Sequence, residues 1–170
     1  MLNSKVAAML NDQINKELYS AYLYLDFSLY FDSEGLDGFA NWYMIQTQEE
    51  RDHAMLMLKY LQENGVRVTL DAVAKPDKEL KDNLEVLNMA LAHEQFITNS
   101  IHDIYSVAYD EKDFRTMQFL DWFVKEQMEE EKNAEDMIKK FELFGDDAKS
   151  LYLLNQELQG RVYSAPSLTV

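Results

Sequence analysis

Four long stretches of the chain carry apolar side chains at the spacing of one helix face, and this pattern constrains the fold more than any other feature. The first three stretches cover residues of about 3–32, 36–64 and 79–110, and the fourth runs from a short turn at 110–113 to about 144. Only 5 Gly and 2 Pro occur among the 170 residues, far fewer than β-sandwiches or doubly wound α/β folds use. We therefore expect an all-α protein of four long helices.

The connections between these helices indicate how they are arranged. At about 1.5 Å per residue each helix is ~45 Å long, and a four-helix bundle buries four apolar faces of this length. Residues 66–78 form the one long irregular connection, and an extended segment of this size reaches ~43–47 Å. It can therefore run the length of the bundle and make the second and third helices parallel. A short fifth helix is expected over 148–159, so that residues 1–160 form one domain and 161–170 an irregular tail.

Each of the four apolar faces carries an ionisable or amide side chain near its middle, where a bundle core should be apolar. These central residues are Glu17, Glu50, His53, Glu94, Gln127 and Glu130. Because the midpoints of bundled helices lie at one height whichever way each helix runs, we expect these side chains to meet. Burying several carboxylates together is costly unless a cation compensates, and the same faces carry no Lys or Arg nearby. Oxygen ligands with one imidazole suit iron or manganese and also accept zinc.

Residues near the central set have two interpretations each. Tyr24 lies two helical turns beyond Glu17, and it either hydrogen-bonds a metal ligand, is oxidised during turnover, or is a core tyrosine with a satisfied hydroxyl. Three neighbouring carboxylates form either an adjacent metal site or a solvated acidic face. These carboxylates are Glu49, Glu126 and Glu129. His93 and His102 lie off the apolar faces and are expected to be structural or exposed.

No single residue carries the metal interpretation. A Glu-x-x-His pair such as Glu50 and His53 arises by chance, and a lone inward histidine is more often a hydrogen-bonded core residue. The coincidence of polar residues at all four helix midpoints is what favours a metal centre.

The overall composition excludes several classes of protein. Lys and Arg number 16 against 31 Asp and Glu, and the resulting net charge of −15 repels nucleic acid and attracts cations. Cysteine is absent, which excludes disulfide scaffolds, thiolate metal sites and cysteine nucleophiles. The longest stretch without a charged residue, 38–48, is far shorter than the ~18 residues of a membrane span. We expect a cytoplasmic protein that contacts neither membrane nor nucleic acid.

The motifs and their order resemble those of the ferritins, in the haem-free prokaryotic branch. The resemblance extends from residue 1 to about 160. It rests on Glu17 and Tyr24, and on the motifs Glu-Glu-Arg-Asp-His at 49–53, His-Glu-Gln at 93–95 and Glu-Gln-Met-Glu-Glu at 126–130. It implies a ferritin-like four-helix bundle with one long crossover connection and a short fifth C-terminal helix.

Function and ligand assignments follow from this resemblance alone. It implies a ferroxidase that oxidises Fe(II) with dioxygen or peroxide and stores ferric mineral in a homo-oligomeric shell of twenty-four subunits. The residues implied to hold the first iron are Glu17, Glu50 and His53, with Glu50 bridging. Those implied for the second iron are Glu94 and Glu130, with Gln127 close by. Those implied for a third iron are Glu49, Glu126, Glu129 and Glu130. Tyr24 matches the tyrosine beside the centre.

The chain departs from other branches of the family at defined positions. Bacterioferritins carry a second Glu-x-x-His where this chain has Gln127 and Glu130. Their haem-binding methionine falls at Arg51, so no haem is expected. The acidic pair that lines the pores of animal catalytic chains is replaced by Met117 and Leu120.

Three other functions compete with iron storage. A di-iron oxidoreductase acting on a small organic substrate would share the centre, although the chain has little length to spare for a substrate pocket. A helical bundle that binds a protein partner, as cytokines do, leaves the central carboxylates unexplained. A shell that only protects DNA by detoxifying iron is a third alternative, and the net charge of −15 argues against direct contact with DNA.

Overall fold

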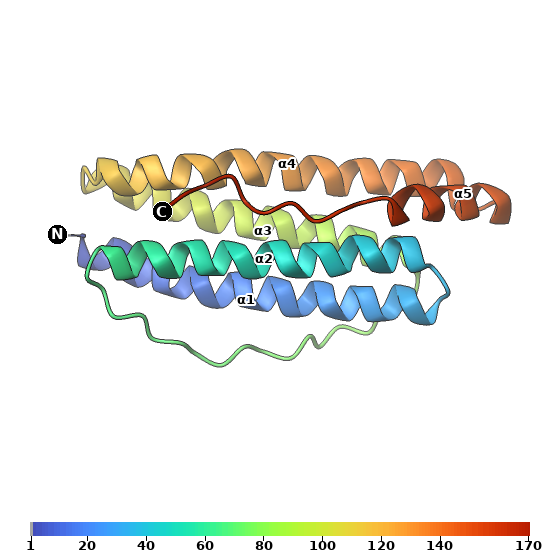
Figure 1. Ribbon diagram of the computed structural model, residues 1–170, viewed down its shortest axis with the longest axis horizontal. Coiled ribbons are helices and arrows are strands. Elements are labelled where there is room, and N and C mark those ends of the chain that lie inside the picture. Colours follow the sequence, from blue (N-terminus) through green and yellow to red (C-terminus); the bar gives the residue numbers. More distant parts are fainter. Residues whose placement is uncertain (1) are drawn as a thin grey trace.

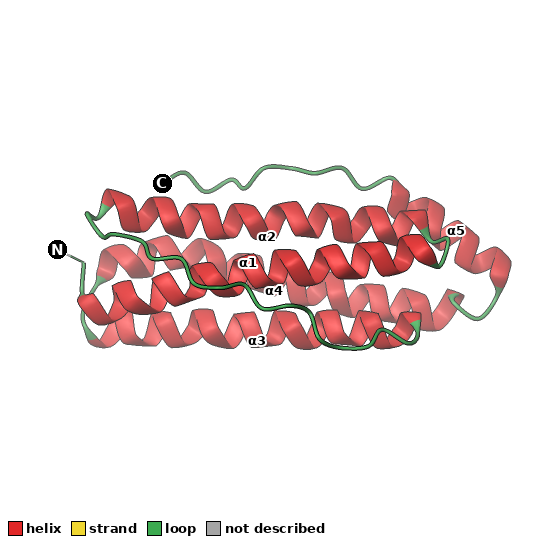
Figure 2. Ribbon diagram, turned by 90° about the horizontal axis from the view of Figure 1, so that it is seen from below, coloured by secondary structure: helices red, strands yellow, loops and turns green. Residues whose placement is uncertain are grey.

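The computed structural model describes residues 2–170, which contain five helices and no strand (Figures 1 and 2). The helices are α1 (Ser4–Ser33), α2 (Asp37–Glu63), α3 (Asn83–Asp110), α4 (Phe114–Phe144) and α5 (Ala148–Gln159). Helices α1 to α4 lie side by side as a bundle, and α5 lies at one end of it (Figure 1). The expected all-α bundle with a short fifth helix is confirmed. Residue 1, where the expected domain begins, lies outside the described residues.

The long connection between α2 and α3 crosses the whole bundle, so that these two helices run in the same direction (Figure 1). It is held against α1 by Asn11, whose side chain exchanges two 2.9 Å hydrogen bonds with the backbone of Thr69. The predicted start of the third helix at about 79 is wrong, because Asp82 caps the helix and accepts a 2.8 Å hydrogen bond from the Glu85 amide. Leu80 continues the apolar spacing but precedes this cap.

The core consists of two apolar clusters with a polar layer between them. On α1, Ile14 belongs to one cluster and Leu23 to the other, and Glu17 lies between them. On α4, Phe123 and Met137 belong to the two clusters in the same way. The residues at the helix midpoints therefore occupy a layer that is closed off from solvent by apolar packing on both sides.

Helix α5 is docked on the beginning of α2. The Asn155 side chain accepts hydrogen bonds from the amides of Gly38 and Phe39, at 2.8 and 3.3 Å. Gly38 is required there, because a Cβ atom at this position would lie 1.7 Å from the Asn155 carbonyl oxygen. The tail after α5 turns back and lies along the face formed by α2 and α4 (Figure 1). No helix among the described residues is long and apolar enough to cross a membrane.

Candidate metal centre

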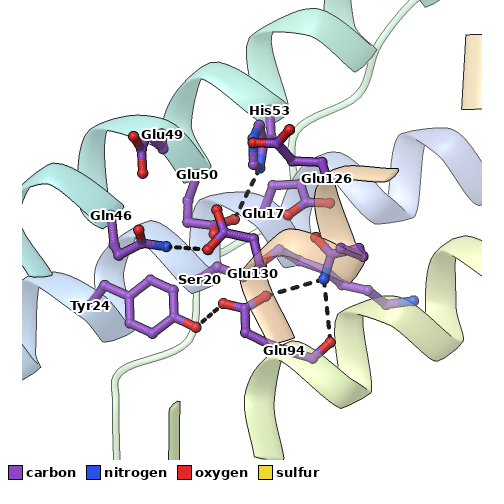
Figure 3. Close-up of polar contacts among 12 residues, drawn as sticks. Glu17, Ser20, Tyr24, Gln46, Glu49, Glu50, His53, Glu94, Glu126 and Glu130 are labelled. Atoms are coloured by element: carbon purple, nitrogen blue, oxygen red, sulfur yellow. Dashed lines mark hydrogen bonds and ion pairs between the residues drawn. The ribbon is translucent and has the colours of Figure 1, made fainter. Parts of the chain in front are cut away.

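All six residues at the helix midpoints are buried, with at most 6% of each side chain exposed. They come from all four bundle helices, and the five acidic and histidine side chains lie around one point of the polar layer (Figure 3), where Gln127 contacts Glu94. One atom from each of Glu17, Glu50 and His53 can be chosen so that all three atoms lie within 4.8 Å of one another. Glu50 Oε2 is 3.5 Å from His53 Nδ1.

Two carboxylate oxygens of this group lack a hydrogen-bond partner. They are Glu17 Oε2 and Glu50 Oε1, and both are fully buried. An unpartnered buried carboxylate oxygen is unfavourable unless a proton or a cation takes the place of the missing donor. The three side chains therefore fit a divalent metal ion, because they offer two free oxygens and one imidazole nitrogen.

Glu94 lies on the other side of the centre and has both oxygens engaged. Tyr24 donates its hydroxyl hydrogen bond to Glu94 Oε1. Gln127 Nε2 donates to Glu94 Oε2 at 3.1 Å and to the Glu94 carbonyl oxygen at 3.3 Å (Figure 3). In this arrangement the Gln127 amide orients Glu94.

Two glutamines that the central set does not include hold its carboxylates. Gln46 Nε2 donates to Glu130 Oε2 at 2.9 Å, and Gln46 Oε1 is buried without a partner. Gln13 Nε2 donates to Glu17 Oε1 at 2.9 Å. Gln13 Oε1 in turn accepts a 2.6 Å hydrogen bond from the Ser100 hydroxyl. Gln13 thereby occupies one oxygen of Glu17 and leaves the other free toward the centre.

Burial makes the charged form of these carboxylates unfavourable. It raises the pKa values of Glu50 and Glu130 well above the usual range, and the neighbouring Glu94 raises both further. Burial also raises the pKa of Glu94 to about 7, against hydrogen bonds from Tyr24 and Gln127. Without a metal, protons are the cations that this cluster holds. A metal ion that binds there displaces them.

The carboxylates proposed for a third site are not gathered in the same way. Glu49 Oε2 pairs with Arg161 at 2.7 Å, and Glu49 lies apart from the other labelled carboxylates in Figure 3. Glu126 Oε1 is 3.9 Å from His53 Nε2, and Glu129 is exposed. Within residues 2–170, the only three-residue group with ligand atoms in close range is the one that contains Glu17.

The two remaining histidines lie outside the centre. His93 Nε2 is 2.7 Å from the Ser20 hydroxyl oxygen, and burial lowers the His93 pKa to about 4. His93 is therefore a neutral, structural residue at physiological pH. His102 is exposed and lines a surface hollow of 770 Å³ together with Glu129 and Met128.

Fold and site together define a class of protein: helical bundles that gather carboxylates and an imidazole in the middle of the core. Residues 7–144 match the ferritin-like domain, and the chain belongs to the ferritin family of iron-storage proteins. This confirms the family indicated by the motifs.

Individual relatives cover nearly the whole chain. The chain is 37% identical to a bacterial non-heme ferritin of Staphylococcus epidermidis over 164 residues. The matched region covers 96% of this chain and 99% of that ferritin. It is 36% identical to a probable bacterial non-heme ferritin-like protein of Haemophilus influenzae, over 93% of this chain and 96% of that one. An open-pore ferritin from the hyperthermophilic archaeon Archaeoglobus fulgidus is similar in structure, with a TM-score of 0.92 and 45% identity over 95% of this chain and 98% of its own. An engineered closed form of the ferritin from that organism has a TM-score of 0.93, with 45% identity over 96% of this chain and 100% of its own.

Proposed function

We propose that this chain is a ferroxidase, which oxidises Fe(II) at the buried centre and deposits ferric mineral inside a homo-oligomeric shell. The observation that carries the proposal is the pair of unpartnered, fully buried oxygens of Glu17 and Glu50 beside His53. Two such oxygens are unfavourable unless a cation binds beside them. A protein whose substrate is Fe(II) supplies that cation.

The two irons occupy different parts of the centre. Glu17, Glu50 and His53 hold the first ion, and Glu50 bridges to the second. The second ion binds between Glu94 and Glu130, whose oxygens accept hydrogen bonds from Gln127 and Gln46. A neutral amide at Gln127 leaves this ion with fewer anionic ligands than the first. Such a site suits a product that must leave.

Carboxylate oxygens favour Fe(III) over Fe(II), so they make the loss of an electron from each ion easier. With dioxygen as the oxidant, two Fe(II), one O₂ and two protons give two Fe(III) and one H₂O₂. With peroxide, two Fe(II), one H₂O₂ and two protons give two Fe(III) and two H₂O. Protons displaced from the carboxyl groups by the incoming iron are available to the oxidant.

Tyr24 positions the second-iron ligand. Burial and the neighbouring Glu94 raise the Tyr24 pKa well above 10, so its hydroxyl stays protonated and donates to Glu94. It also borders a small cavity of about 20 Å³ that Gln46, Glu94 and Glu130 help to line. This cavity is large enough for one water-sized molecule beside the metals.

The size of that cavity argues against an organic substrate. Pockets for small organic molecules usually measure ~300 Å³ or more. The cavity that Glu94 and Glu130 line is too small for such a substrate, and the neighbouring hollow of about 390 Å³ is lined by neither glutamate. Iron ions and a small oxidant fit the centre, so the oxidoreductase alternative is not favoured.

Assembly into a shell is supported by the relatives, which are ferritins. Phe114, Met128 and Leu143 are each at least 70% exposed, but they lie at the start, middle and end of α4 and do not by themselves mark an interface. We infer a cytoplasmic homo-oligomer of the twenty-four-subunit ferritin type. The net charge of −15 favours the approach of Fe(II) to this shell and the nucleation of mineral on it.

The test is to add Fe(II) aerobically to the metal-free protein, follow ferric absorbance and measure particle size in the same sample. Rapid oxidation with hundreds of irons retained per large particle is expected. Glu50→Gln should slow the initial rate at least about tenfold, since it removes the bridging charge, whereas the exposed control Glu142→Gln should not. Two irons bound per chain in a small particle, without mineral, would instead identify a di-iron enzyme.

A further inference from the structure

The C-terminal tail brings a positive charge to the edge of the proposed iron centre. Residues 161–170 lie along the face formed by α2 and α4 (Figure 1), and Arg161 is the only basic residue among them. The tail is fixed further on by Tyr163, which donates to Asp52 at 2.5 Å. Ser167 accepts a 3.0 Å hydrogen bond from the Trp122 indole. The tail is therefore held at several points along this face.

Arg161 is built into its position by three separate contacts. Its guanidinium pairs with Glu49 Oε2 at 2.7 Å, and both side chains are only 17% exposed. A second guanidinium nitrogen donates to the Trp42 carbonyl oxygen at 3.2 Å. The guanidinium carbon lies 4.0 Å from the centroid of the Trp42 ring, within the range of a cation–π interaction.

Glu49 is therefore already neutralised by a cation that belongs to the chain. Burial raises the Glu49 pKa, and Arg161 and His53 oppose this shift. Glu126 is half-buried, and its Oε1 lies 3.9 Å from His53 Nε2. Among the described residues, Arg161 is the Lys or Arg that forms an ion pair with a carboxylate proposed for the third iron.

We propose that Arg161 takes the place of a third metal ion and that iron must displace its guanidinium from Glu49 before a third site can form. This inference rests on the proposed function, because it concerns the carboxylates next to the two-iron centre. The exchange conserves the pairing of Glu49, since one cation replaces another. Arg161 keeps its contacts with the Trp42 carbonyl and ring after it leaves Glu49, so its positive charge still has interaction partners. The tail thereby ranks the sites, and two ions bind before the third.

The competition can be measured with Zn(II), a redox-inert ion that oxygen and imidazole ligands accept. Calorimetric titration of the metal-free, assembled protein should show two tight equivalents per chain and a weaker third. In Arg161→Ala the third equivalent should bind about tenfold more tightly, equivalent to about 1.4 kcal/mol, with the first two unchanged. Adding Glu49→Gln to that variant should abolish the gain.

Two control variants separate the charge of Arg161 from other effects. Arg67→Ala removes an exposed positive charge on the crossover. Ser167→Ala removes the Trp122 hydrogen bond and loosens the tail but keeps Arg161. Neither should change the affinity for the third ion.

The proposal is overturned if Arg161→Ala binds the third ion within twofold of the wild type, or if Ser167→Ala has the same effect as Arg161→Ala. Failure of the wild-type protein to bind the first two Zn(II) equivalents tightly would be a different result. It would remove the two-ion centre, and with it the proposed function.

Discussion

Replacing the Glu94 carboxyl group with an amide should remove a defined part of the pH dependence of stability in the metal-free protein. Glu94 is 2% exposed, and burial raises its pKa from 4.5 to about 7. Since the folded-state pKa is the higher one, its contribution to stability is fully present below pH 4.5. It is lost as the pH rises toward 7.

The size of this effect follows from the pKa shift. One proton bound over about 2.5 pH units, at about 1.36 kcal/mol per unit, corresponds to about 3 kcal/mol. Part of this stability is already lost at pH 5, so Glu94→Gln should stabilise the protein by about 2.5 kcal/mol more at pH 8 than at pH 5. Any constant cost of altered contacts with Tyr24 and Gln127 cancels in this difference.

The assay is urea unfolding of both proteins at pH 5 and pH 8 in the presence of a chelator, followed by circular dichroism. Glu142→Gln, which removes an exposed carboxyl group from α4, should give the same difference from the wild type at both pH values. If Glu94→Gln changes the free energy of unfolding equally at pH 5 and pH 8, Glu94 does not hold a proton through burial and the electrostatic account is refuted.

Three further substitutions test individual roles. His53→Ala should slow Fe(II) oxidation at least about tenfold while the circular dichroism spectrum stays unchanged, and a wild-type rate would remove His53 from the ligand set. Gln13→Leu should weaken the first Zn(II) equivalent about tenfold, because Glu17 loses the hydrogen bond that orients it, and an unchanged affinity would make Gln13 a bystander. Glu129→Ala should spare the initial rate and change the iron taken up per turnover. The same stoichiometry as the wild type would remove the reason to assign Glu129 to a third site.

The bundle could be predicted from the sequence because each helix has its own apolar pattern and the same pattern recurs in all four. Apolar residues at helical spacing define each helix, and one long connection among short ones defines the crossover. The error at the start of α3 has a simple cause. Leu80 packs against the core and so continues the apolar pattern. The helix nevertheless begins only at Asn83, because the Asp82 side chain accepts a hydrogen bond from the Glu85 amide and caps it. Packing and helix formation are separate properties there.

For the site, the sequence predicts only the height of each residue along its helix. Midpoint positions place Glu17 and Glu50 at one height, and the structure has them in close range with His53. The midpoint argument does not tell which residues orient those ligands. Gln13 is a polar residue on the same face as Glu17, and its role depends on Ser100, which is 87 residues away in the chain.

Arg161 lies beyond any such argument, because it is 112 residues from Glu49 and outside the helices. Its position depends on where α5 docks and on the path of the tail, and neither follows from helical spacing. This position matters for metal binding, because the Arg161 guanidinium adds one positive charge beside the acidic cluster. The Arg161 guanidinium is held by Trp42 as well as by Glu49, and under our proposal a third ion competes with it. If the proposal holds, two ferritin chains with similar iron ligands need not fill their sites in the same order, because the tail then contributes to the affinity of the last site.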